Sequence, residues 1–146
     1  MSNLIDIAQY VCDNLGEITS MKLQKLIYYC QAWSLVWDEQ PLFENEIKAW
    51  VYGPVIPDLY GMHRKMFKVN SSVFKNLGSD SNSLNDKEKE TIDAVLKYYG
   101  DKSSQWLIEL SHLEKPWIDA REDLDKNERG NNLITLDSMM EYYSSL

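Results

Sequence analysis

The chain has 146 residues, of which 44% are hydrophobic, an ordinary share for a globular protein. Its 15 basic and 23 acidic side chains give a net charge of −8 at pH 7 with histidine neutral, and such a surface disfavours nucleic-acid binding because it repels phosphate backbones. Five Trp and nine Tyr residues exclude a disordered chain, and the length predicts a single domain over residues 1–146.

The sequence lacks the usual marks of export and of membrane insertion. It has no basic start followed by an apolar run, and no apolar stretch approaches the length of a membrane span. Cys12 and Cys30 share no motif spacing and fall in apolar helical patterns, so we expect buried free thiols, as in a reducing compartment. These features predict a cytoplasmic protein without a membrane partner.

Two helices are predicted at the start of the chain. Apolar residues recur at helical spacing from Leu4 to Leu15, and Gly16 suits a C-terminal stop. The second helix follows a Thr19 cap and runs to about Trp37. Its apolar positions cover more than one face, which predicts a central helix wrapped by others. They are Met21, Leu23, Leu26, Ile27, Tyr28, Cys30, Ala32, Trp33, Leu35, Val36 and Trp37.

A strand is predicted next, because Ile47, Ala49 and Val51 alternate with polar or aromatic residues until Gly53-Pro54 breaks the pattern. If those three face the core, Trp50 and Tyr52 lie on the opposite face, free for a partner or for a covering element. The segment Leu133-Ile134 is a candidate to pair with this strand.

Short helices and loops are predicted for the remainder. Pro57 suits a helix start with an inward stripe formed by Leu59, Met62, Met66 and Phe67, and residues 70–82 are typical of a loop. Further helices are predicted after a capping box at Asn85-Asp86-Lys87-Glu88, after Ser103 or Ser104 with Trp106, Leu107 and Leu110 inward, at Pro116, and after Thr135. The pattern predicts a mainly α (α+β) fold: one compact helical domain around the helix at about 19–37, with at most a short two-stranded sheet.

Catalytic and metal-binding motifs are hard to assemble from this chain. Glu109 and His112 have the spacing of a di-iron half-site, but the only other histidine, His63, has Tyr60 at the matching position. A cysteine in a buried helix is a poor nucleophile, and no glycine-rich phosphate loop is present. We therefore predict a protein that is not an enzyme and has no metal or cofactor; a ligand- or metal-dependent enzyme would need a polar pocket around His112 and Glu109.

Several short motifs, in this order and spacing, resemble the signature of the Panacea domain, a family that includes SocA-like antitoxins and phage-associated proteins. They are Thr19-Ser20-Met21-Lys22-Leu23-Gln24-Lys25-Leu26, Tyr28-Tyr29, Pro41-Leu42-Phe43, Ala49-Trp50, Tyr52-Gly53-Pro54-Val55 and Pro116-Trp117. The resemblance implies an antitoxin that neutralises its cognate toxin by direct protein–protein binding. It also leaves open delivery of the toxin to a Clp-type protease and self-association as a homodimer. The alternative is a phage-encoded interaction protein that binds a host factor.

The candidate partner-binding residues are Trp50, Tyr52, Pro54, Lys22 and Lys25. Trp and Tyr beside a proline-fixed backbone make good interface anchors, because they give large contact area for little lost entropy. The two lysines either edge a recognition surface with Gln24 or are only solvated. The motif residues expected to be structural are Leu23, Leu26, Tyr29, Gly53, Pro116 and Trp117.

Overall fold

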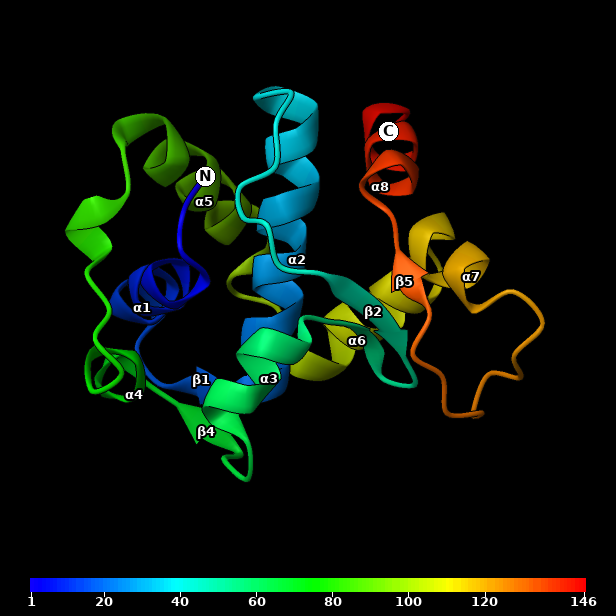
Figure 1. The fold of residues 1–146 in the computed structure, drawn as a ribbon, viewed down its shortest axis with the longest axis horizontal. Coiled ribbons are helices and arrows are strands. Elements are labelled where there is room, and N and C mark those ends of the chain that lie inside the picture. The colour runs from blue at the N-terminus through cyan, green and yellow to red at the C-terminus, as the bar shows by residue number, and fades with distance from the viewer.

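The computed structural model describes residues 1–146 and confirms the mainly helical fold (Figure 1). The helices are α1 (Leu4–Leu15), α2 (Ser20–Trp37), α3 (Pro57–His63), α4 (Ser71–Lys75), α5 (Asp86–Tyr99), α6 (Ser104–His112), α7 (Lys115–Arg121) and α8 (Leu136–Ser144). The strands are β1 (Ile18–Thr19), β2 (Ile47–Trp50), β3 (Gly53–Val55), β4 (Lys68–Val69) and β5 (Leu133–Ile134), and a 3-10 turn spans Ser81–Ser83.

Helix α2 is the centre of the fold, as predicted. It runs through the middle of the molecule, with α1 and α4 on one side and α7 and α8 on the other (Figure 1). The Thr19 side chain accepts a hydrogen bond from the Lys22 backbone N–H, which caps the helix as expected. Leu23, Leu26 and Tyr29 are 0% exposed, and every residue from Leu23 to Ala32 is buried, so neighbouring elements cover this part of α2 around its circumference.

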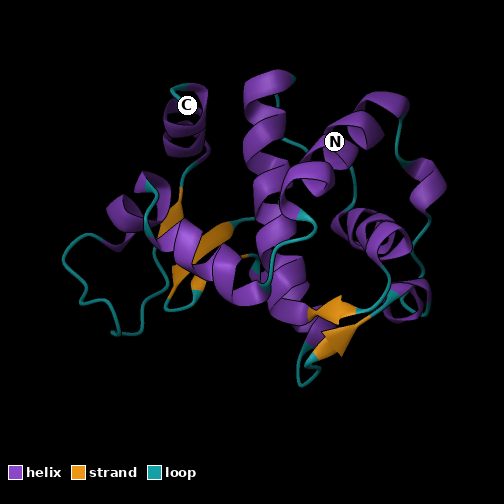
Figure 2. Cartoon of the chain, turned by 180° about the vertical axis from the view of Figure 1, so that it is seen from behind, coloured by secondary structure: helices purple, strands orange, loops and turns teal.

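The main sheet has three antiparallel strands in the order β3-β2-β5. The predicted pairing of Leu133-Ile134 with the first strand is confirmed, with Ile47 opposite Ile134. The sheet has one strand more than expected, because Gly53–Val55 continues as β3 where the sequence indicated only a turn. A separate two-stranded ribbon joins β1 to β4, and Figure 2 shows it at the lower end of α2.

The segment after α3 departs from the prediction. The helix ends at His63, because Arg64 is extended and Lys65 has a positive φ of 67°. The chain then turns into β4 instead of continuing the helical stripe, and Met66 and Phe67 are 42% and 75% exposed instead of inward. Residues 70–82, predicted to form a loop, contain α4 and most of the 3-10 turn.

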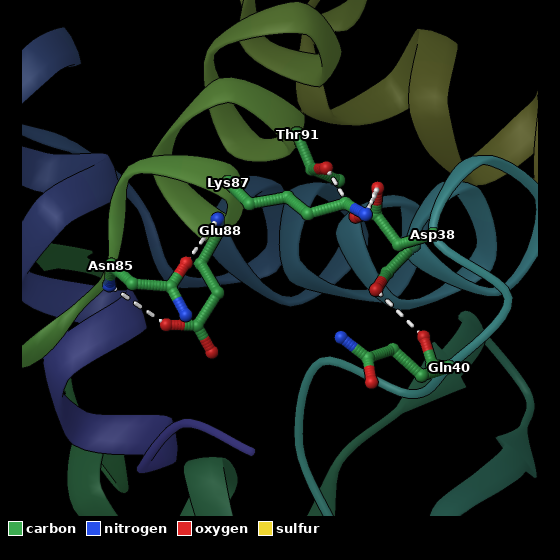
Figure 3. Close-up of polar contacts among 7 residues, drawn as sticks. Asp38, Gln40, Asn85, Lys87, Glu88 and Thr91 are labelled. Carbon is green, nitrogen blue, oxygen red and sulfur yellow. Dashed lines mark hydrogen bonds and ion pairs between the residues drawn. The ribbon is translucent and has the colours of Figure 1, made fainter.

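The upper end of α2 is attached to α5 (Figure 3). The Asp38 carboxylate, at the C-terminal cap of α2, accepts a hydrogen bond from Thr91 Oγ1 at 2.6 Å and lies 3.9 Å from Lys87 Nζ. The predicted capping box is present, since the Asn85 and Glu88 side chains each accept a hydrogen bond from the other's backbone N–H. The start of α5 is therefore fixed both by its own cap and by α2.

Two buried glutamines of α2 form hydrogen bonds to the backbone of segments that pack against the helix. Gln31 Oε1 accepts hydrogen bonds from the backbone N–H groups of Leu42 and Phe43 at 2.7 and 3.2 Å, and Nε2 donates to the Phe43 carbonyl at 2.9 Å. Gln24 pairs in the same way with both backbone groups of Ile56. Gln24 is only 2% exposed, so the expectation that it edges a surface was wrong.

Candidate functional site

A groove of about 360 Å³ lies beside the N-terminal end of α2. Its walls come from α2, from the hairpin of β2 and β3, from α3 and from the segment that follows α3. The lining residues are Ser20, Met21, Gln24, Lys25, Trp50, Tyr52, Val55, Tyr60, His63, Lys65, Met66 and Phe67. The groove thus brings together two of the predicted partner-binding aromatics with residues that the sequence did not single out.

Large apolar side chains stand exposed around the groove. Tyr52 is 63% exposed, Phe67 75%, Met66 42% and Tyr60 39%. Isolated exposed apolar residues are normal on a protein surface, but a cluster around a concave site is typical of an interaction surface. These four side chains form what we call the apolar rim of the groove.

Trp50 is partly covered by its own chain. Its indole Nε1 donates a hydrogen bond to Asn131 Oδ1 at 2.9 Å, and its ring meets that of Tyr60 edge-on at 5.4 Å. Ile47 and Ala49 are 2% and 0% exposed, so the predicted inward face is confirmed for these two residues, whereas β2 ends at Trp50 and Val51 lies half-buried in the turn. Trp50 therefore forms a wall of the groove, while Tyr52 is the more accessible of the two predicted anchors.

Lys25 lies beneath the groove and not at its edge. Its side chain is 0% exposed, and Nζ donates one hydrogen bond, of 3.2 Å, to the Pro54 carbonyl. Burial lowers the pKa of Lys25 to about 7, and no carboxylate pairs with it. The expectation that Lys25 is an accessible surface residue was therefore wrong. Lys22 is partly exposed, and burial lowers its pKa while Asp101 opposes the shift.

A second ionisable group lies close to Lys25. His63 is 5% exposed, and its Nε2 is 2.9 Å from Gln24 Nε2. Because both amide hydrogens of Gln24 are donors, His63 Nε2 is the acceptor in this contact. Burial lowers the pKa of His63, and the positive charge of Lys25 lowers it further. The groove therefore has a buried polar base below an apolar rim.

Gly53 allows the hairpin to approach Lys25. Its φ of +107° is unfavourable for residues with a side chain, and an added Cβ would lie 2.7 Å from Lys25 Cε and 2.8 Å from Ser111 Oγ. Pro54 is buried in β3, so it is not itself an accessible contact residue, contrary to its place among the candidates. Its contribution to the site is the carbonyl that receives Lys25 Nζ.

The Pro116-Trp117 motif packs beside the β2–β3 hairpin. Trp117 is 6% exposed, and its Nε1 donates to the Trp50 carbonyl at 2.8 Å. The ring of His112 stacks on Trp117 at 4.1 Å, and burial lowers the pKa of this histidine. Arg121 is buried at the end of α7 and donates from one guanidinium nitrogen to the Ala49 carbonyl at 2.9 Å. The structural role expected for Trp117 fits these contacts, and Pro116 is buried near the start of α7.

A buried tyrosine cluster joins the same region to the C-terminal helix. The hydroxyls of Tyr29 and Tyr143 both donate to Glu114 Oε1, at 2.7 and 2.8 Å, and Tyr28 lies 2.9 Å from the Tyr143 hydroxyl. Burial raises the pKa of Glu114, and the two hydroxyl bonds oppose that shift. All four side chains are at most 5% exposed, so this cluster connects α2 and α8 to the start of α7 and has no open face for a ligand.

The structure does not assemble a catalytic or metal-binding set around the residues considered from the sequence. Glu109 is exposed and accepts a hydrogen bond from Gln105, while His112 faces Trp117. No group of three or more His, Cys, Asp or Glu side chains is arranged to hold a metal ion. Cys12 and Cys30 are free and buried, as predicted, and burial raises both thiol pKa values. None of the helices combines the length and apolarity needed to cross a bilayer.

The large apolar groove residues that were not among the predicted partner-binding residues include Met21, Tyr60, Met66 and Phe67. For the last two a signal was present: Met66-Phe67 is an apolar pair within the basic run His63-Arg64-Lys65 and Lys68. An apolar pair flanked by charges is as compatible with an exposed turn as with the buried side of a helix. Tyr60 and Met21 gave no signal, because each lies within an ordinary helical pattern.

Comparison with known proteins identifies two similarities. The family described as "Antitoxin SocA-like, Panacea domain" matches residues 23–118. The curated protein Antitoxin SocA of Caulobacter vibrioides (strain NA1000 / CB15N) is 29% identical over 125 residues, which cover 80% of this chain and 64% of the relative. The chain thus corresponds to less than two thirds of the relative's length. No solved structure shows a significant match.

Proposed function

Because the chain belongs to the family of SocA-like antitoxins with a Panacea domain, we propose that it is a non-enzymatic antitoxin that neutralises a cognate toxin by binding it directly. Residues 23–118, which match the family, include every residue that lines the groove except Ser20 and Met21. The family match supports the antitoxin role, and the geometry of the groove supports the proposal that the toxin binds there.

The observation that carries this proposal is the apolar rim. Tyr52 and Phe67 are among the most exposed large apolar side chains, and both line the same groove. An aromatic side chain that is exposed in the free protein can bury a large area in a complex, and such residues supply most of the binding energy at many interfaces. We therefore propose that the toxin covers the groove and contacts Tyr52 and Phe67, with Trp50 as the wall behind them.

The test is co-expression of this chain with the product of the neighbouring open reading frame, with growth and complex formation measured together. Wild-type chain should restore growth and co-purify with that product. Tyr52→Ala and Phe67→Ala should weaken both effects without unfolding the chain, since both side chains are exposed. Tyr98→Ala and Leu113→Ala are matched controls, because these side chains are 63% and 77% exposed and lie outside the groove.

Each other outcome has its own meaning. Growth rescue without a stable complex would favour delivery of the toxin to a Clp-type protease. Absence of both rescue and binding would reject the neighbouring product as a cognate toxin and favour the host-factor alternative. A complex that survives both groove substitutions would reject the groove as the binding site, and its stoichiometry would show whether this chain acts as a homodimer.

A further inference from the structure

The groove differs in charge from the rest of the protein. Its lining contains the exposed Lys65 and the buried Lys25 and His63, but no aspartate or glutamate. The whole chain, in contrast, has 23 acidic and 15 basic side chains. Two more basic residues, Arg64 and Lys68, flank the lining residues Lys65, Met66 and Phe67 and are exposed. The apolar rim therefore lies in a local basic region of an acidic protein.

The basic groups at the groove have no acidic partners within the chain. The four ion pairs of the structure involve Lys48, Lys87, Lys102 and Lys115. None of them involves Arg64, Lys65 or Lys68, and Lys25 has only the Pro54 carbonyl as an acceptor. The exposed cations Arg64, Lys65 and Lys68 are thus available to act on a molecule that enters the groove, whereas Lys25 is buried beneath it.

We propose that the groove binds a segment of the partner protein in which acidic side chains alternate with, or adjoin, aromatic or large aliphatic ones. This inference rests on the proposed function and specifies the chemistry of the toxin segment that the groove takes. The apolar side chains of that segment lie against Trp50, Tyr60 and Phe67. Its carboxylates face Lys65 in the lining, and the exposed Arg64 and Lys68, which flank the lining residues in the sequence, add to the attraction.

The acidic remainder of the surface adds selectivity to this arrangement. An acidic segment is repelled by most of a protein of net charge −8 and attracted only where basic side chains gather. The attraction steers the segment to the groove, where burial of its apolar side chains then provides most of the affinity. A basic segment would instead be drawn to many places on the surface and would meet like charge at the groove.

The experiment is a selection from a display library of random linear peptides against the full chain. Binders are then tested against the Phe67→Ser variant, and those that depend on Phe67 are sequenced. We expect them to combine Asp or Glu with Phe, Tyr, Trp, Leu or Ile. For a synthetic peptide of the consensus, Lys65→Glu should raise Kd by about tenfold, equal to about 1.4 kcal/mol, and added salt should weaken binding.

The matched control is Lys75→Glu, because Lys75 is exposed, forms no ion pair and lies on α4, outside the groove. Its Kd should change by less than about twofold. Thermal melting of the three variants confirms that they remain folded. The inference is overturned if Phe67-dependent peptides are basic or uncharged, if no Phe67-dependent peptide is enriched, or if Lys65→Glu and Lys75→Glu behave alike.

The outcome of the peptide selection can be distinguished from the outcome of the toxin co-expression test. Toxin rescue that depends on Tyr52 and Phe67, together with a basic or uncharged consensus, would keep the antitoxin and reject the acidic segment. An acidic consensus without toxin rescue would keep the groove's chemistry and transfer it to a different partner.

Discussion

The side-chain amide of Gln24 makes both hydrogen bonds that a neighbouring strand would make with Ile56. Its Oε1 accepts from the Ile56 N–H at 2.8 Å, and its Nε2 donates to the Ile56 carbonyl at 3.3 Å. Ile56 follows β3 and is 0% exposed, so its backbone groups are out of reach of water. A helix side chain thus takes the place of a strand and fixes the end of the groove's hairpin.

Loss of this amide should destabilise the fold. Gln24→Ala leaves the buried Ile56 N–H without an acceptor, while the Ile56 carbonyl keeps its hydrogen bond from the Tyr60 N–H, and should lower the free energy of unfolding by about 1–3 kcal/mol. Gln31→Ala should cost at least as much, because two N–H groups depend on it. Urea denaturation measures both, with Gln105→Ala on the exposed face of α6 as the control. A loss for Gln24→Ala no greater than for Gln105→Ala would contradict the role assigned to the amide.

Lys25 should make stability depend on pH above neutrality. Its folded pKa of about 7 lies below the ordinary 10.5, so the unfolded chain binds more protons between these values. The stability associated with the neutral amine is therefore present at high pH and is lost as pH falls through about 7. Relative to Lys25→Met, which does not titrate, wild type should gain about 3 kcal/mol of unfolding free energy from pH 6 to pH 9.

Subtracting the Lys25→Met curve removes the titration of every other group that the two chains share. Urea unfolding at several pH values gives the two curves. A constant difference between them would show that Lys25 titrates in the folded protein as it does in water, and hence that its ammonium is hydrated.

Gly53 should be intolerant of any side chain. Gly53→Ala combines an unfavourable positive φ with close contacts to Lys25 and Ser111, and should cost about 2–4 kcal/mol. Gly61→Ala is the matched control, since an added Cβ there has no neighbour within 4 Å and lies in helix α3. It should be neutral or stabilise by up to about 1 kcal/mol. Thermal melting of both variants tests the contrast, and equal melting points would reject it.

Glu114 should lower stability as pH rises above the acidic range. Burial raises its folded pKa above the unfolded value, so its contribution is fully present below the unfolded pKa and is lost as pH rises through the folded one. Glu114→Gln keeps an acceptor for Tyr29 and Tyr143 but does not titrate. The stability of wild type relative to this variant should therefore fall as pH rises through the folded pKa of Glu114, which urea unfolding at several pH values measures.

A second substitution separates the charge of Glu114 from its hydrogen bonds. Glu114→Ala leaves two buried hydroxyls without an acceptor and should cost about 2 kcal/mol or more at any pH. If Glu114→Gln and Glu114→Ala are equally destabilised at neutral pH, the hydrogen bonds do not carry the stability assigned to them.

The features that sequence predicted well are those decided by neighbouring residues. Thr19 caps α2, Asn85 and Glu88 form the capping box, and Gly16 ends α1, because each depends on groups within a few positions. The burial of Lys25 could not be predicted in this way. It depends on the Pro54 carbonyl and on the absence of a side chain at Gly53, and only the tertiary fold brings these to Lys25.

The exposure of Met66 and Phe67 was missed for a different reason. Their helical spacing from Leu59 was real, but the helix ends at His63, and Lys65 adopts a left-handed backbone that reverses the chain. The β1–β4 ribbon favours this turn, and directly beside the ribbon the Ser20 N–H donates to the Phe67 carbonyl at 2.9 Å. That partner lies far away in the sequence, so local periodicity gave the wrong face.

The order of synthesis gives the β3-β2-β5 arrangement a further consequence. Strand β2 leaves the ribosome long before β5, which closes its other edge. At ordinary elongation rates that delay is on the order of 10 s. Through this interval the nascent hairpin has an unpaired edge beside Trp50, open to proteases and to other strands. A chain that stops before Leu133 keeps this edge unpaired, so we expect such shortened products to be more sensitive to proteases than the chain that includes β5.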